Sequence, residues 1–139
     1  MREILFRGQT RRHGEKVKLD GDKVPGHWVY GGIFQGTGDY SVIYNINGKY
    51  AVYSDTVGQY TGLKDKNGER IFEGDIVRYR TVIGIVNWHI GCFCIKNYTT
   101  NNYYNNPAID IILNEYPNEI EIIGNIYDNP ELLKEGAHE

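Results

Sequence analysis

Three residues with soft-metal chemistry lie close together in the stretch HIGCFC: His89, Cys92 and Cys94. Thiolates and imidazoles are the ligands of structural zinc, but such sites need four ligands, usually as two pairs set apart in the chain. Another histidine or a carboxylate would have to complete the set; the other histidines are His13, His27 and His138. Two small buried hydrophobic residues beside a turn at Gly91 are the simpler interpretation. We therefore expect neither a metal nor a cofactor.

The spacing of the two cysteines also bears on their redox state. Separated by one residue, Cys92 and Cys94 would point the same way from a strand, which is a poor arrangement for a disulfide with each other. Free thiols are typical of a reducing compartment. The N-terminal stretch MREILFRGQTRR has only a short apolar run, and no segment approaches the ~20 apolar residues of a membrane helix. We expect a cytoplasmic protein without membrane contact.

Residues of hydrolytic catalysis are present but lack a recognisable arrangement. A Glu73–Asp75 acid–base pair would need a cleft, a third group and raised pKa values, none of which spacing supplies. Asp75 follows Gly74 and is first a turn residue whose carboxylate accepts hydrogen bonds from backbone amides. Ser41 and Ser54 lie in expected strands without a nucleophile elbow. We expect no enzyme, and a small-metabolite hydrolase would require converging polar groups in a deep pocket.

Glycines recur through the stretch TVGQYTGLKDKNGERIFEGDIV, residues 56–77. A phosphate cradle needs glycines that lead from a strand into a helix, whereas strands follow here, and no Gly-Lys-Ser/Thr is present. An EF-hand is excluded because position 12 counted from Asp65 is Ile76 rather than Glu. We interpret TGLKDKNG as a turn-rich connection with glycines at backbone positions that favour them: Gly58, Gly62, Gly68 and Gly74.

Nucleic-acid binding is the remaining chemistry. The chain carries a net charge of -3, yet residues 1–24 hold seven basic groups against four acidic ones. This arm could contact phosphate, or dock onto its own body or a sister subunit. Tyrosines of the segment NYTTNNYYNNPA could stack on bases, although packing and loop anchoring are simpler roles for them. The candidate contacts are Arg7, Arg11, Arg12, Lys16, Lys18, Tyr98, Tyr103 and Tyr104.

The elements that must position these residues are mostly strands, because apolar residues alternate along the chain instead of recurring at helical spacing. The sequence predicts strands at 27–34, 40–46, 49–54, 75–80, 82–88, 92–98, 108–113 and 119–127. Asn47-Gly48 predicts a type I′ hairpin turn, and Asn67-Gly68 repeats the signal. The hairpin expected at 75–88 has the layout of one in a small SH3-like barrel.

A single short helix is expected at the C-terminal end, in YDNPELLKE, where Asn129 can cap and Pro130 fits the first helical position. The segment 97–108 is interpreted as a loop or a long hairpin tip. A chain of 139 residues can bury one core without disulfides or metal, so we expect one domain.

Four stretches, in order, give the chain a family resemblance: REILFRG, HWVYGGIF, TVGQYTGLKDKNGERIFEGDIV and EIIGNIYDNPELL. The chain resembles the YopX-like proteins of bacteriophages and prophages of Gram-positive bacteria nearly from end to end, departing from them at 12–26 and 97–106. The resemblance implies a single YopX-like domain over 1–139 and a mainly β fold of coiled, interleaved antiparallel sheets. It implies no established activity, and its signature positions Gly58, Gly62, Gly68, Gly74 and Asp75 are structural.

Two functional classes follow. The first and favoured one is an accessory protein that assembles with itself or captures a host or phage protein, since twelve tyrosines and several strand edges suit such surfaces. The alternative is a small β-barrel nucleic-acid-binding module that uses the N-terminal basic arm; the acidic remainder of the chain counts against it. The partner, the number of subunits and the role in the viral cycle stay open.

Overall fold

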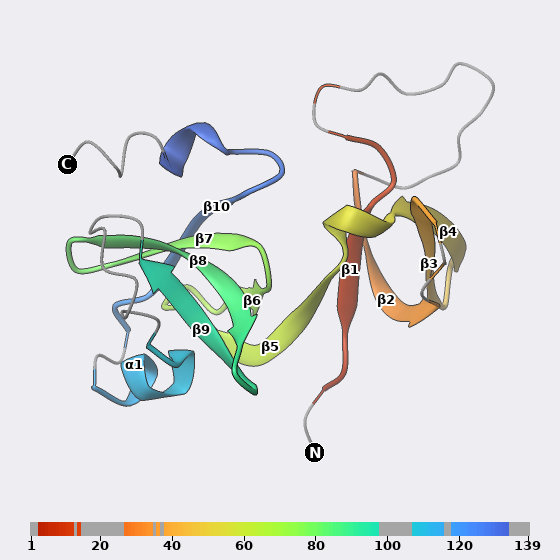
Figure 1. Cartoon of the computed structure of the whole chain (residues 1–139). Coiled ribbons are helices and arrows are strands. Elements are labelled where there is room, and N and C mark those ends of the chain that lie inside the picture. Colours follow the sequence, from red (N-terminus) through yellow and green to blue (C-terminus); the bar gives the residue numbers. More distant parts are fainter. Residues whose placement is uncertain are drawn as a thin grey trace. The chain divides into compact units, whose positions relative to one another are not determined.

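The computed structural model describes residues 3–12, 14, 27–34, 36, 38–97, 107–115 and 118–133 (Figure 1). The chain divides into two compact units, Met1–Tyr60 and Thr61–Glu139. Each unit contains a cluster of buried hydrophobic residues of its own. The protein is mainly β, with two antiparallel sheets, as predicted. A single family domain over 1–139 stays a prediction.

The first sheet has six strands in the order β4-β3-β2-β1-β5-β6. The first four belong to the first unit: β1 (Phe6–Gln9), β2 (Trp28–Phe34), β3 (Tyr40–Asn45) and β4 (Gly48–Tyr53). A 3₁₀ turn, η1 (Ser54–Thr56), leads into β5 (Gly58–Lys64), which passes from the first unit into the second, and β6 (Arg70–Phe72) follows there. The sequence did not predict β1, β5 or β6.

The core of the first unit lies on one face of its strands and consists of Val29, Ile43 and Val52. Directly paired residues of antiparallel strands share a face, so Ile33 and Tyr50, which pair with Ile43, line this core as well. A Cβ on Gly8 of β1 would lie 2.8 Å from Cγ2 of Val52, which places β1 against β4 across this core.

The second sheet has the order β10-β7-β8-β9. Its strands are β7 (Asp75–Tyr79), β8 (Val82–His89), β9 (Cys92–Asn97) and β10 (Glu121–Asn125), and a helix α1 (Ile109–Glu115) follows β9. The β10–β7 register shifts between Ile122 and Gly124, which marks a β-bulge. The described strands close no barrel, so the SH3-like portion stays a prediction.

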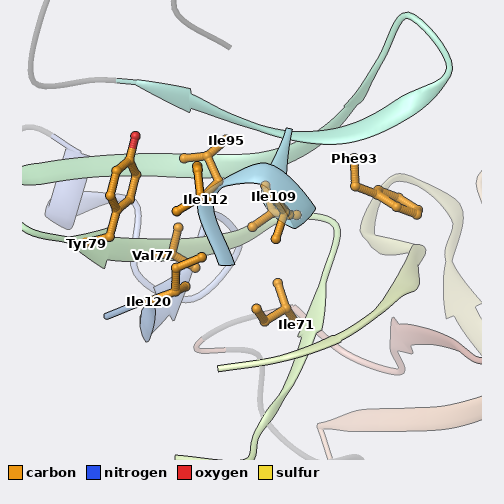
Figure 2. Packing of buried hydrophobic residues seen from close by; sticks show 9 residues of the cluster. Ile71, Val77, Tyr79, Phe93, Ile95, Ile109, Ile112 and Ile120 are labelled. Atoms are coloured by element: carbon orange, nitrogen blue, oxygen red, sulfur yellow. The ribbon is translucent and has the colours of Figure 1, made fainter. Parts of the chain in front are cut away.

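Figure 2 shows the core of the second unit, in which Ile109 and Ile112 of α1 project toward Val77 and Ile95 of the sheet. The strand predicted at 108–113 is therefore wrong. Residues three apart share a helix face, and burial of Ile109 with Ile112 leaves Ile111 54% exposed on another face.

The hairpin predicted at Asn47-Gly48 exists, but its turn is placed differently. Asn45 pairs with Gly48, so that the two loop residues are Ile46 and Asn47, and neither has a positive φ. The type I′ prediction is therefore wrong. The side chain of Asn45 forms the turn instead, because its Oδ1 accepts a hydrogen bond of 2.8 Å from the amide of Asn47.

The second predicted type I′ turn also takes another form, since Gly68 has a positive φ and Asn67 does not. Oδ1 of Asp65 accepts hydrogen bonds of 2.9 Å from the amides of both Asn67 and Glu69. A two-residue loop with positive φ at both positions occurs at Ile90 (φ 47°) and Gly91 (φ 79°), between β8 and β9.

The predicted C-terminal helix begins within the described residues. Residues 131–133 are helical, and the amide of Leu132 donates to the carbonyl oxygen of Asn129. The remaining residues of the predicted helix, 134 and 135, and most of the predicted loop at 97–108 lie outside the described residues.

Candidate interaction surface

The face of the first unit's sheet opposite its core carries exposed aromatic side chains. Because Val29, Ile33, Ile43 and Val52 point inward, alternation along each strand turns their neighbours outward. Exposed fractions run from 44% for Tyr30 to 69% for Phe34, with Tyr40 and Tyr44 between them. We call the following residues the outer aromatic face: Tyr30, Phe34, Tyr40, Val42, Tyr44, Ala51 and Tyr53.

Strand register arranges this face in rows. Val42 of β3 pairs with Phe34 of β2 on one side and Ala51 of β4 on the other. Tyr44, in the next row, pairs with Gly32 and Lys49. Side chains in neighbouring rows of one face lie within reach of each other, so the apolar side chains form a continuous surface across three strands.

One end of the outer aromatic face carries a cation. The rings of Tyr40 and Tyr53 have centroids 5.2 Å apart, and the guanidinium carbon of Arg12 lies 4.1 Å from the centroid of Tyr53. Nη1 of Arg12 also donates to Oδ2 of Asp55 at 3.1 Å. Arg12 therefore presents a charge that is partly neutralised and stacked on the aromatic surface.

The predicted nucleic-acid contacts do not form one cluster among the described residues. Arg7 is only 6% exposed within β1, and its guanidinium carbon lies 4.5 Å from the ring centroid of Trp28. Arg11 is half-buried, and Arg12 takes part in the pair with Asp55. The other five candidates lie outside the described residues: Lys16, Lys18, Tyr98, Tyr103 and Tyr104.

The two cysteines lie side by side, as their spacing predicted. Sγ of Cys92 and Sγ of Cys94 are 3.4 Å apart, both thiols are free, and Cys92 is exposed whereas Cys94 is buried. Among the described residues no three His, Cys, Asp or Glu side chains are grouped closely enough to hold a metal ion, so His89 does not complete a site with the thiols. Burial raises the pKa of Cys94 to about 11, and a hydrogen bond with Cys92 and the charges of Cys92 and Asp110 act in the same direction.

Three of the four signature glycines have a backbone conformation that favours glycine, and the structural role of the signature block stays a prediction. Gly62, Gly68 and Gly74 have positive φ, and Gly58 does not. Oδ2 of the buried Asp75 accepts a hydrogen bond of 2.8 Å from the amide of Phe72, as expected of a turn residue.

Gly74 joins neighbouring segments of the second unit through its backbone. Its amide donates to the carbonyl oxygen of Val86, and its own carbonyl oxygen accepts from the amide of Ile126. Its φ of +88° and the ring of Tyr127, 3.0 Å from where a Cβ would lie, both favour glycine at this position.

Sequence reasoning missed the outer aromatic face because it used alternation only to find buried residues. The signal was present: Tyr30 and Phe34, and likewise Tyr40 and Tyr44, occupy the strand positions that alternate with the buried ones. A solvated sheet face usually carries polar residues at these positions.

Comparison with known proteins assigns the chain to a family. The family's sequence model, described as YopX protein, matches residues 12–134, and the chain belongs to the YopX family. The chain is also similar to the crystal structure of protein EF1440 from Enterococcus faecalis, with 29% sequence identity and a TM-score of 0.41. This similarity covers 68% of the present chain and 75% of that one. No curated protein matches the chain. Within the described parts, none of the helices has the length and apolar character needed to cross a bilayer.

Proposed function

We propose that this protein is a phage- or prophage-encoded accessory protein that acts in the bacterial cytoplasm through protein contacts, first of all with copies of itself, and not by catalysis. The observation that carries this proposal is the outer aromatic face, on which Tyr30, Phe34, Tyr40 and Tyr44 are each at least 44% exposed. Family membership supports the viral origin.

Such a face is better suited to an interface than to solvent. Monomeric proteins seldom expose contiguous apolar surface across several strands, and aromatic residues are enriched at the centres of interfaces. Isolated exposed hydrophobic residues need no such explanation, but here the register places them in adjacent rows.

The edge of the sheet supports self-association in particular. β4 is the last strand in the sheet order, and its outward side chains include a single cation, Lys49. Terminal strands are usually protected by several charges, by proline or by a covering element. Antiparallel pairing of β4 with its counterpart in a second copy would be a closed two-fold contact and would join the two outer aromatic faces.

The test is sedimentation velocity with the full chain from low micromolar to several hundred micromolar concentration. We expect wild-type dimers, and Phe34→Ser or Tyr40→Ser should weaken dimerisation by about 2 kcal/mol, or about 30-fold, as for central interface residues. Ile111→Ser is the matched control, because it removes a comparably exposed apolar side chain from α1. A strictly monomeric mass at the highest concentration would refute self-association.

Nucleic-acid binding is a second candidate because Arg12 lies on Tyr53 beside Tyr40, which combines a cation with aromatic rings. The ion pair of Arg12 with Asp55 and the net charge of -3 weaken this candidate. Fluorescence anisotropy with labelled single-stranded and duplex DNA separates the two. Micromolar affinity that falls steeply with salt would support binding through phosphates, and no binding at low salt would exclude it.

A further inference from the structure

The β8–β9 hairpin holds its two thiols in an arrangement that neither the family nor the proposed function explains. His89 pairs with Cys92 and Asn87 pairs with Cys94, so both cysteines lie on the sheet face opposite the core residue Phe93. Their sulfur atoms are 3.4 Å apart, and both thiols are within 3.6 to 3.8 Å of the carbonyl oxygen of His89.

A bond between the two sulfurs would be strained, because two positions on one face of an extended strand reach the geometry of a disulfide only at its limit. Residues i and i+2 of a strand have Cα atoms roughly 6.6 to 6.8 Å apart, which is at the upper end of the range of about 4.4 to 6.8 Å found for disulfides. Same-face Cβ atoms of an extended strand are about as far apart as these Cα atoms, whereas a disulfide needs about 3.5 to 4.5 Å between Cβ atoms. β9 must therefore contract locally to bring the two sulfurs from 3.4 Å to bonding distance. Disulfides under such strain are easily reduced, which is typical of regulatory rather than permanent bonds.

We propose that Cys92 and Cys94 form a redox-sensitive dithiol that a hydroperoxide converts reversibly into an intrastrand disulfide. The thiolate of Cys92 attacks the peroxide oxygen, the O–O bond breaks, and Cys92 becomes a sulfenic acid while water or an alcohol leaves. The sulfur of Cys94 then attacks the sulfur of Cys92, and the displaced hydroxide leaves as water with the proton of Cys94. Two thiols are oxidised, and one hydroperoxide is reduced.

The exposure of the two cysteines shows which one meets the peroxide first and which one then closes the disulfide. Cys92 is exposed and can meet the oxidant, whereas Cys94 is buried behind it. The thiolate is the reacting form, and the raised pKa of Cys94 keeps that residue protonated near neutral pH. Cys92 is therefore the attacking residue and Cys94 the resolving one. The free thiols of the structure represent the reduced state.

A natural reporter lies next to the pair. Phe93, between the two cysteines, packs edge-on against Trp88 with ring centroids 4.8 Å apart. Contraction of β9 must shift Phe93 relative to Trp88. Formation of the disulfide should therefore change the fluorescence of Trp88, which can be recorded in a Trp28→Phe background.

The experiment treats the reduced full chain with one equivalent of hydrogen peroxide, blocks remaining thiols and measures the intact mass. Wild-type protein should lose the mass of two hydrogen atoms, change its Trp88 fluorescence, and recover both properties with dithiothreitol. Cys94→Ser and Cys94→Ala should instead accumulate a sulfenic acid that dimedone traps. Cys92→Ser should react at least tenfold more slowly than wild type.

Two results would overturn the proposal. One is wild-type protein that gains oxygen, or forms disulfide-linked dimers, instead of losing two hydrogens within a single chain, which would show that Cys94 does not resolve Cys92. The other is Cys92→Ser reacting as fast as wild type, which would contradict the assignment of Cys92 as the attacking residue. Neither result depends on whether the outer aromatic face mediates self-association.

Discussion

The ring of Tyr44 occupies the space that a side chain would take at Gly32, its direct partner on the neighbouring strand. A Cβ on Gly32 would lie 2.4 Å from Cζ and 2.6 Å from the hydroxyl oxygen of Tyr44. The absence of a side chain at Gly32 thus lets Tyr44 lie across β2, where it fills the row beside Phe34.

Gly32→Ala should displace the ring of Tyr44 while leaving the fold intact. The tyrosine can rotate away, and alanine is favoured over glycine within a strand, so we expect the free energy of unfolding to change by less than about 1 kcal/mol. Self-association, measured by sedimentation velocity, should weaken.

Gly31→Ala is the control for this substitution. A Cβ on Gly31 would lie 2.1 Å from the backbone oxygen of Tyr44, which cannot rotate away as a side chain can. Urea unfolding should show a loss of more than about 2 kcal/mol for Gly31→Ala, and equal losses for the two variants would contradict this geometry.

Asp65→Asn should destabilise the second unit. Oδ1 of Asp65 accepts from the amides of Asn67 and Glu69, and Oδ2 accepts from the amide of Ile122 at 3.0 Å. Asparagine keeps one acceptor oxygen and turns a donor toward an amide, so we expect a loss of about 2 kcal/mol in urea unfolding followed by Trp88 fluorescence.

Asp110→Asn provides the control for this substitution. Its carboxylate is exposed and accepts from the adjacent amide of Ile111. We expect a change of less than about 1 kcal/mol, the size of an exposed carboxylate's effect at a helix N-terminus. An Asp65→Asn variant as stable as Asp110→Asn would show that the three amide contacts contribute little.

Ile90→Asn should stabilise the protein. Ile90 has a φ of 47° at a hairpin turn and is 87% exposed, so it bears the steric cost of a β-branched residue in a left-handed conformation without compensating burial. Asparagine tolerates this conformation, and we expect a gain of about 1 kcal/mol in thermal or urea unfolding. Ile46→Asn, at a fully exposed turn residue without positive φ, should give no comparable gain.

Stability should fall at alkaline pH through Cys94. The folded-state pKa is about 11, above the ordinary value of 9.0, so the unfolded chain loses this proton first as pH rises. The contribution of the Cys94 thiol to the free energy of unfolding is complete below pH 9 and is lost between about pH 9 and 11. Above that range it causes no further change in stability. Unfolding of wild type and Cys94→Ala should be compared at each pH, since this subtraction removes the other titrating groups. The difference in free energy of unfolding between wild type and Cys94→Ala should shrink by about 2 to 3 kcal/mol. An unchanged difference would argue against a buried neutral thiol.

Strands with clear alternation could be predicted from the sequence because that pattern is local. The runs that became β2, β3, β4, β7, β8 and β9 were found within a residue or two of their observed ends. The two-residue period of a strand also predicted that Cys92 and Cys94 lie on the same face, which is confirmed.

Other elements depend on contacts that local pattern does not record. The run AIDIIL suits a strand by composition, yet Ile109 and Ile112 are buried together only as a helix on the second sheet. β5 was mistaken for a connection because glycines favour turns, while its first half is held by pairing of Gly58 with Arg7 of β1. Alternation does mark Tyr30, Phe34, Tyr40 and Tyr44 as opposite to the buried positions, but whether another element covers that face depends on contacts between distant segments.

The order in which strands pair has a consequence for folding during synthesis. In the first unit, the amide of Tyr60 donates a hydrogen bond to the carbonyl oxygen of Leu5. The described strands of this unit therefore have their pairing partners once residue 60 has left the ribosome. The second sheet lacks its edge strand β10 until residue 125 emerges, and the contact of Asp65 with Ile122 spans 57 residues. One edge of β7 therefore stays unpaired while more than forty further residues are translated. Unpaired strand edges in such incompletely folded chains are prone to mispairing and aggregation.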